Sequence, residues 1–172
     1  IVMDTIHRTP PAALAGAGID LRLGDGFPGR LRPARVLVAD DEEPVRELMA
    51  RVLARGGCDV VAVRDGAEAV EAESGGSPPF DVVILDMAMP RKSGVEAYRE
   101  IARHNSASRF LFTSAYYESG LLNDVLREGR SGFLPKPFLP GCILEEVQHL
   151  IGGETAPSVA TEAPQVLPIL FG

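Results

Sequence analysis

Three aspartates follow two apolar segments of this chain. Asp40 and Asp41 come directly after residues 36–39, and Asp86 comes directly after residues 82–85. Each segment is typical of a buried strand, so the three carboxylates are expected to lie together at one edge of a sheet. Like charges so close repel strongly at reduced dielectric unless a cation lies between them. Carboxylate oxygens with room left for water are ligands that suit Mg²⁺, so the sequence predicts a magnesium-binding acidic cluster.

Length and composition limit the kind of protein that can carry this cluster. The chain has 172 residues, of which 45% are hydrophobic and 24% are charged, with a net charge of −7. These values suit one globular domain with extensions, and the negative charge argues against a nucleic-acid surface, which would be basic. No apolar run approaches the roughly 20 residues of a membrane span, so no membrane contact is expected. Cys58 and Cys142 lie far apart in no metal or redox motif, and a reducing cytoplasm is the expected setting.

Apolar periodicity predicts an alternation of strands and helices from residue 35 onward. Strands are expected at residues 35–39, 59–63, 81–85, 109–113 and 132–134. Helices are expected from Pro44 to Gly56, and at residues 67–73, 95–104, 120–128 and 141–151. The apolar face of the first helix is expected to be Val45, Leu48, Met49, Val52 and Leu53. This alternation predicts an α/β fold with a doubly wound, five-stranded parallel sheet.

The ends of the chain lack this pattern. Residues 1–33 are rich in Gly and Pro and are expected to form an arm or linker, in which only residues 19–23 alternate as a strand would. The regular domain covers residues 34–152, and residues 153–172 are expected to form a flexible tail. Its apolar end, residues 166–171, has two interpretations: a disordered tail, or a docking peptide for a neighbouring domain or second protomer.

The polar residues of interest all follow predicted strands. In open α/β sheets the active crevice lies beyond the carboxyl ends of the strands. Four strand-to-helix connections contribute a candidate there: Asp40–Asp41, Asp86, Ser114 and Lys136. Their convergence at one edge predicts a single functional site.

Four ordered motifs connect this pattern to a known family. They are Asp40–Asp41, Asp86 followed by Met89–Pro90, Ser114–Ala115 and Lys136–Pro137. Over residues 34–152 the chain resembles the receiver domain of the bacterial two-component response-regulator family. The resemblance implies the flavodoxin-like receiver fold with strand order 2-1-3-4-5. Residues 93–98 and 132–138 resemble receivers attached to hybrid histidine kinases, and both a lone receiver and a part of such a kinase stay open.

The resemblance also assigns roles around the expected metal. Asp86 is implied to be the phospho-acceptor, a carboxylate nucleophile that forms an aspartyl phosphate. Asp41 and Asp86 are implied to bind Mg²⁺ directly, Asp40 through water, and Ala88 through its backbone carbonyl. The competing interpretation, three helix-capping aspartates without a metal, explains Asp40 or Asp41 but not all three acids.

Further roles follow from the two last strands. Lys136 is implied to bind a phosphoryl oxygen as a point charge, and Pro137 to follow a cis peptide bond. Ser114 is implied to donate its hydroxyl to the phosphoryl group, with Thr113 as the competitor one residue earlier. Phe133 occupies the aromatic switch position, although it is also compatible with an ordinary core residue.

The function implied is a phosphorylation-controlled signalling switch. A partner histidine kinase or histidine phosphotransfer protein donates the phosphoryl group to Asp86 with Mg²⁺ as cofactor. The surface of residues 120–128, 132–134 and 141–151 then changes, and output passes through a partner, a homodimer or an attached domain. At most slow self-dephosphorylation is expected, not dedicated enzyme activity. An aspartyl-phosphate hydrolase would carry a second acid where Ala88 stands, and an unphosphorylated interaction module would lack an acid or the lysine, none of which is missing.

Overall fold

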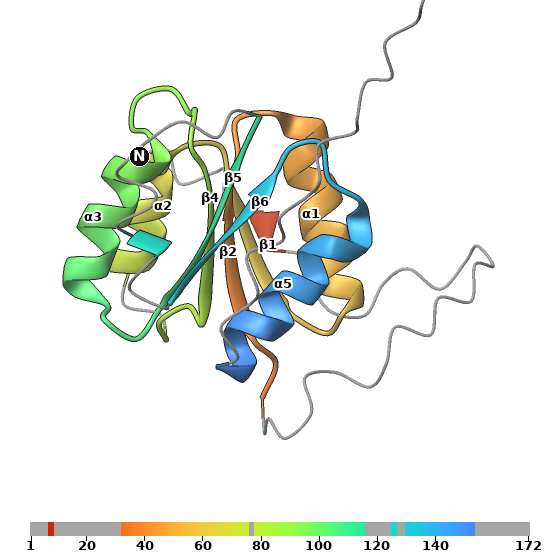
Figure 1. Ribbon diagram of the computed structural model, residues 1–172. Coiled ribbons are helices and arrows are strands. Elements are labelled where there is room, and N and C mark those ends of the chain that lie inside the picture. The colour runs from red at the N-terminus through yellow and green to blue at the C-terminus, as the bar shows by residue number, and fades with distance from the viewer. Residues whose placement is uncertain (1–6, 9–31, 76–77, 116–124, 127–129, 154–172) are drawn as a thin grey trace, which may run out of the picture.

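A sheet with strand order β1-β3-β2-β4-β5-β6 lies at the centre of the computed structural model, which describes residues 7–8, 32–75, 78–115, 125–126 and 130–153 (Figure 1). Its parallel strands are β2 (Arg35–Ala39), β3 (Asp59–Val63), β4 (Val82–Asp86), β5 (Arg109–Ser114) and β6 (Ser131–Pro135). Their number, direction and order confirm the doubly wound sheet predicted from the sequence. The edge position of β6 accommodates Pro135, which has no backbone N–H to donate.

One strand was not predicted. β1 (His7–Arg8) pairs antiparallel with β3, with His7 opposite Ala62 and Arg8 opposite Val61. A two-residue strand is too short to show a period of two, so no sequence pattern indicates it. The strand expected at residues 19–23 lies outside the described residues.

Helices cover both faces of the sheet (Figure 1). α1 (Glu43–Arg55) and α5 (Pro140–Gly152) pack on one face, and α2 (Gly66–Ser74) and α3 (Gly94–His104) on the other. The helix expected at residues 120–128 falls mostly outside the described residues; Val125 and Leu126 are helical and pack against the α2–α3 face. No helix in the described ranges combines the length and apolarity needed to cross a bilayer.

The alternation of side chains along β4 determines toward which face of the sheet Asp86 points. Val82 and Ile84 belong to the core under α1 and α5, and Val83 and Leu85 to the core under α2 and α3. All five positions of β4 are buried, as predicted for a central strand. Asp86 ends the strand in phase with Val82 and Ile84, so it continues toward the α1–α5 face at the carboxyl edge of the sheet.

The first helix shows one difference from the prediction. Met49, Ala50 and Leu53 are its buried residues, whereas Leu48, expected to face the core, is 40% exposed. The apolar stripe of α1 is thus centred on Met49 and Leu53, and Leu48 lies at its margin. Periodicity defines such a stripe but not its centre, because the neighbouring α5 determines which side is covered.

Candidate functional site

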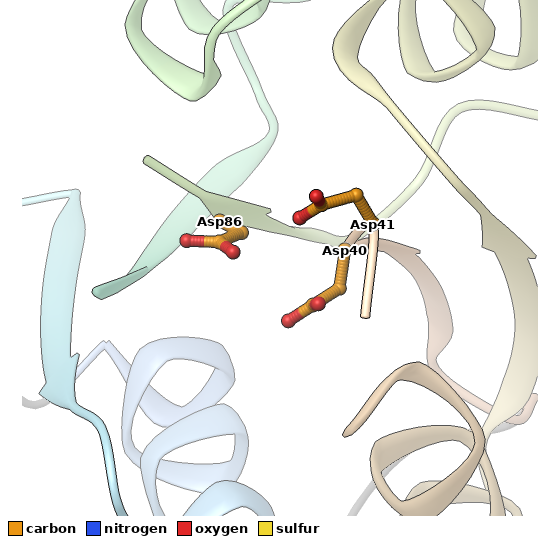
Figure 2. A group of neighbouring side chains, drawn as sticks. All are labelled: Asp40, Asp41 and Asp86. Carbon is orange, nitrogen blue, oxygen red and sulfur yellow. The ribbon is translucent and has the colours of Figure 1, made fainter. Parts of the chain in front are cut away.

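The three aspartates lie together at the carboxyl edge of the sheet (Figure 2). Asp40 and Asp41 follow β2, and Asp86 ends the neighbouring parallel strand β4, in which Leu85 pairs with Ala39. One carboxylate oxygen of each residue lies within 4.8 Å of the others. Asp40 is 0% and Asp86 4% exposed, while Asp41 is open to solvent. The structure therefore brings together the acids that the sequence placed at strand ends.

Lys136 faces this cluster from the end of β6. Its Nζ lies 2.9 Å from Oδ2 of Asp40 and 2.9 Å from Oδ2 of Asp86. A third carboxylate, Glu42, places Oε1 3.0 Å from the same nitrogen. Burial lowers the pKa of Lys136, but the contacts of its ammonium with the three carboxylates outweigh burial and raise the pKa above its ordinary value. The side chain is therefore an ammonium ion at neutral pH.

Glu42 was not among the predicted site residues. It stands directly after Asp41 and precedes α1 as its N-cap residue, but its side chain makes no capping hydrogen bond. Ser, Thr, Asp and Asn are the residues that cap helices well. A glutamate directly after an acidic pair, at a position where it caps poorly, is the signal that the sequence offered.

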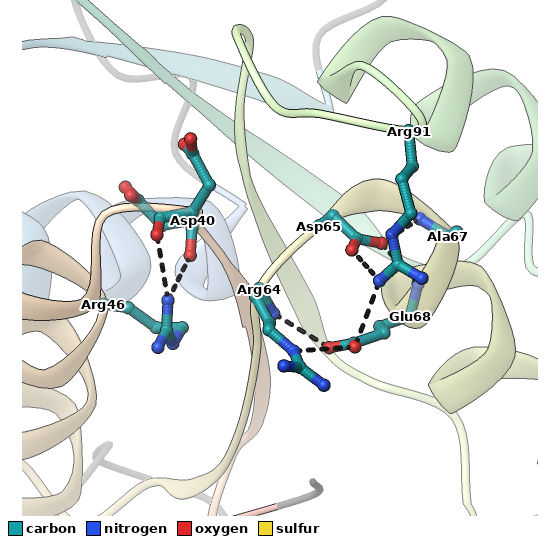
Figure 3. Close-up of polar contacts among 8 residues, drawn as sticks. Asp40, Arg46, Arg64, Asp65, Ala67, Glu68 and Arg91 are labelled. Carbon is teal, nitrogen blue, oxygen red and sulfur yellow. Dashed lines mark hydrogen bonds and ion pairs between the residues drawn. The ribbon is translucent and has the colours of Figure 1, made fainter.

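The loop between β2 and α1 is fixed by its own backbone and by α1. The N–H of Glu42 donates to Oδ1 of Asp40 at 2.9 Å. Arg46 donates from Nη1 to the carbonyl oxygens of Asp40 at 2.7 Å and Asp41 at 3.4 Å (Figure 3). Because both contacts are to backbone carbonyls, Arg46 holds the acidic pair in position without neutralising its carboxylates.

The carboxylate of Asp40 is itself affected by burial. Burial raises the pKa of Asp40, against the lowering effect of Lys136.

The donor set fits a hard divalent cation. Asp40, Asp41 and Asp86 offer oxygen atoms alone, and the exposure of Asp41 leaves a side open to water. Mg²⁺ binds through few carboxylates and keeps several waters. Oδ2 of Asp40 is buried and, within the described part of the chain, has the ion pair with Lys136 but no hydrogen bond. Helix capping does not explain these acids, because the N-cap of α1 is Glu42.

Two hydroxyls lie at the end of β5. Ser114 is its last residue and is 7% exposed; its carbonyl accepts a hydrogen bond of 2.8 Å from the N–H of Lys136. Thr113 lies in register with Asp86, and its buried Oγ1 has no hydrogen-bond partner among the described residues. Both candidates named from the sequence are thus at the correct edge of the sheet.

The remaining predicted residues lie around the cluster. The peptide bond before Pro137 is cis, which confirms the expectation drawn from the resemblance. Ala88 is exposed and its N–H donates to Oδ1 of Asp86 at 3.3 Å. Phe133 is half-buried and packs against the α2–α3 core.

Comparison with known proteins identifies this arrangement. The family model for the response regulator receiver domain matches residues 36–148. The chain belongs to this family. The chemotaxis protein CheY of Bacillus subtilis is 32% identical over 118 residues, which cover 68% of this chain and 97% of that protein.

Other relatives of this receiver domain are longer. The sensor kinase CckA of Brucella abortus is 36% identical over 107 residues, 61% of this chain but 11% of CckA. The match to the response regulator MprA of Mycobacterium species is 32% identical and covers 77% of this chain but 56% of MprA. Among solved structures, the CheX–CheY–BeF₃–Mg²⁺ complex of Borrelia burgdorferi is 26% identical with a TM-score of 0.61, covering 69% of this chain and 90% of the matched one.

The receiver domain closes the loop after Asp86 with a glycine. The N–H of Gly94 donates to the carbonyl of Met87 at 3.3 Å, where α3 begins. A Cβ on Gly94 would lie 2.3 Å from the carbonyl oxygen of Asp86. No side chain fits there unless the backbone that carries the phospho-acceptor candidate moves.

Replacement of Gly94 by alanine is therefore expected to displace this backbone. The free energy of unfolding should fall by about 2–3 kcal/mol, as for an overpacked core position, and Mg²⁺ affinity should fall with it. Urea denaturation and Mg²⁺ titration measure the two effects. Gly141→Ala is the matched control, since a Cβ there meets no atom within 4 Å. Equal stability of the two variants would show that the backbone adapts without cost.

A second polar network attaches the loop between β4 and α3 to the start of α2 (Figure 3). Arg91 has a positive φ of 62° and forms ion pairs with Asp65 and, at 3.1 Å, with Glu68. Burial raises the pKa of Asp65, but the N–H of Glu68 and the guanidinium of Arg91 outweigh it and hold the pKa below its ordinary value. The carbonyl of Lys92 also accepts a hydrogen bond from the N–H of Gly66 at 3.3 Å. The loop after β4 is thus attached to α2 through charged and backbone groups.

Proposed function

We propose that this receiver domain is a phospho-accepting switch in which Asp86 takes a phosphoryl group from a partner phosphohistidine. The observation that supports this most directly is the contact of one ammonium, Lys136, with both Asp86 and Asp40 beside Asp41. A carboxylate oxygen of Asp86 attacks phosphorus and forms an O–P bond. The P–N bond of the donor breaks, and the imidazole keeps its electron pair and takes a proton from solvent.

Around the nucleophile, the other residues bind and neutralise charge. We propose that Asp41, Asp86 and the carbonyl of Ala88 hold Mg²⁺ directly, and Asp40 through water. When bound, Mg²⁺ offsets the charge shared by the carboxylate nucleophile and the phosphoryl oxygens. Lys136 supplies a positive point charge to a phosphoryl oxygen after transfer. Asp40, fully buried, keeps that ammonium aligned with Asp86.

The response to phosphorylation is proposed to pass through β6 and α5. Phosphorylation adds about −1.5 to −2 charges, which attract Lys136 and the hydroxyl of Ser114. Phe133 belongs to β6, and Lys136 directly follows this strand. We propose that Phe133 moves when Lys136 moves, and that this changes the surface of residues 120–128, 132–134 and 141–151. Thr113 is the alternative hydroxyl donor.

The partners proposed are a histidine kinase or a histidine phosphotransfer protein, with a homodimer as one route of output. The match of this chain to part of CckA supports the proposal that residues 34–152 form a receiver of the kind that also occurs within larger kinases. Residues 1–33 and 153–172 are proposed to be an arm and a tail around it.

Acetyl phosphate with Mg²⁺, followed by intact-protein mass spectrometry, tests this function. The expected result is the gain of one phosphoryl group per chain, lost when EDTA removes the metal, since the carboxylates alone repel an anionic donor. No gain at saturating Mg²⁺ would favour an unphosphorylated interaction module. Rapid turnover of varied phosphoesters would favour a hydrolase.

A further inference from the structure

Glu42 competes for the ammonium that the phosphoryl group requires. Its Oε1 lies 3.0 Å from Nζ of Lys136, although the two residues are 94 positions apart in the sequence. An ammonium has three N–H donors, and the same nitrogen also faces Asp40 and Asp86 at 2.9 Å each. Three carboxylates therefore surround the ammonium of Lys136 in this structure: Glu42 and Asp86 accept hydrogen bonds from it, and Asp40 forms an ion pair with it.

The three carboxylates differ in how easily they can be released. Asp40 is fully buried and its Oδ2 has no hydrogen bond from the described residues, so its separation from Lys136 would leave a buried charge unpaired. The side chain of Glu42 is 59% exposed, so water can solvate its carboxylate once the contact is broken. Glu42 is thus the acceptor that an incoming phosphoryl oxygen can displace.

Glu42 also adds negative charge close to the site at which the negatively charged phosphoryl group would bind. It contacts the same ammonium as Asp86, so its carboxylate lies within a few ångströms of the position of the phosphoryl group. The repulsion is moderate because the group is exposed and screened by salt. Both effects, competition for Lys136 and repulsion of the phosphoryl group, have the same sign.

We propose that Glu42 restrains Lys136 and thereby slows phosphorylation of Asp86. This inference rests on the proposed function and adds a regulator to the same site. The backbone of Glu42 starts α1, since its carbonyl accepts from the N–H groups of Val45 and Arg46 at 3.0 and 2.9 Å. Its side chain makes no capping bond, so the carboxylate can be removed without loss of the helix terminus.

Glu42→Gln tests the restraint, with Glu43→Gln as the matched control. Glu43 is the next residue, is exposed in the first turn of α1, and forms no ion pair with Lys136. At saturating Mg²⁺, Glu42→Gln should accept phosphoryl from acetyl phosphate about 3–10 times faster than the unmodified chain. The gain should shrink between about 0.05 M and about 0.5 M salt. Glu43→Gln should change the rate less than twofold.

Beryllofluoride binding with Mg²⁺ provides a second readout, because it imitates the phosphoryl group without a transfer step. Glu42→Gln should bind it more tightly by a similar factor, while urea denaturation shows unchanged stability. A rate and an affinity no higher than those of the unmodified chain would overturn the restraint alone. If the unmodified chain neither accepts phosphoryl nor binds beryllofluoride, the proposed function fails and the restraint with it.

Discussion

Asp86→Asn is expected to abolish phosphoryl uptake while leaving the fold intact. An amide is not a nucleophile toward phosphorus, so the rate with acetyl phosphate should fall by about 100-fold or more. The free energy of unfolding should stay equal or rise by about 1 kcal/mol, because one like charge leaves a cluster in which, among the described residues, Lys136 is the cation paired with these acids. Intact-protein mass spectrometry and urea denaturation measure the two quantities on the same preparation.

Asp41→Asn distinguishes the nucleophile from a metal ligand. This variant keeps the carboxylate of Asp86 and replaces one of the three clustered carboxylates with a neutral amide, which is a weaker ligand for a hard divalent cation. Its uptake should be weak at low Mg²⁺ and recover as Mg²⁺ is raised, whereas Asp86→Asn should not recover at any concentration. Phosphoryl uptake by Asp86→Asn would contradict the assignment, as would failure of Asp41→Asn at every Mg²⁺ concentration.

The sequence predicts the strands and helices whose hydrophobic patterns recur along the chain. The continuous apolar run of β4 and the acid at its end place Asp86 at the edge of the sheet, and the same pattern in β2 places Asp40 beside it. The position of these acids could therefore be predicted from the strand pattern and from a topology in which neighbouring parallel strands end at the same edge of the sheet. The centre of the stripe on α1 could not be predicted, and Leu48 is exposed, because the packing of α5 determines it.

Contacts between loops were less accessible from the sequence. Glu42 meets Lys136 across 94 positions, and Arg91 meets Asp65 across 26. Such pairs depend on how loops approach one another once the sheet has formed, and no local period encodes that approach. The end of β5 shows the same limit: register places Thr113 opposite Asp86, whereas only the resemblance favours Ser114 as the hydroxyl donor.

Lys136→Met is expected to destabilise the chain most strongly at neutral pH and low Mg²⁺. The side chain of Lys136 is 11% exposed, and its removal leaves Asp40 and Asp86 without their cationic partner. Loss of one partner from a buried ion pair costs about 3 kcal/mol of unfolding free energy. Lys92→Met is the matched control, because Lys92 pairs with the half-exposed Glu100 at the surface, where the expected loss is below about 1 kcal/mol.

The pH dependence of this deficit has a definite sign. Burial already raises the pKa of Asp40 above its ordinary value of 3.8, and loss of the ammonium that lowers it raises it further. A folded-state pKa above the unfolded one means that the folded state binds more protons, so stability increases as the pH falls through that pKa. In the unmodified chain the Lys136 contribution is fully present below pH 10.5, its ordinary pKa, and is lost only as the pH rises through the higher folded-state value. The deficit of Lys136→Met should therefore shrink as the pH is lowered from neutral through the raised pKa of Asp40, and added Mg²⁺ should reduce it at pH 7. A deficit that grows on acidification would show that Lys136 does not compensate these acids.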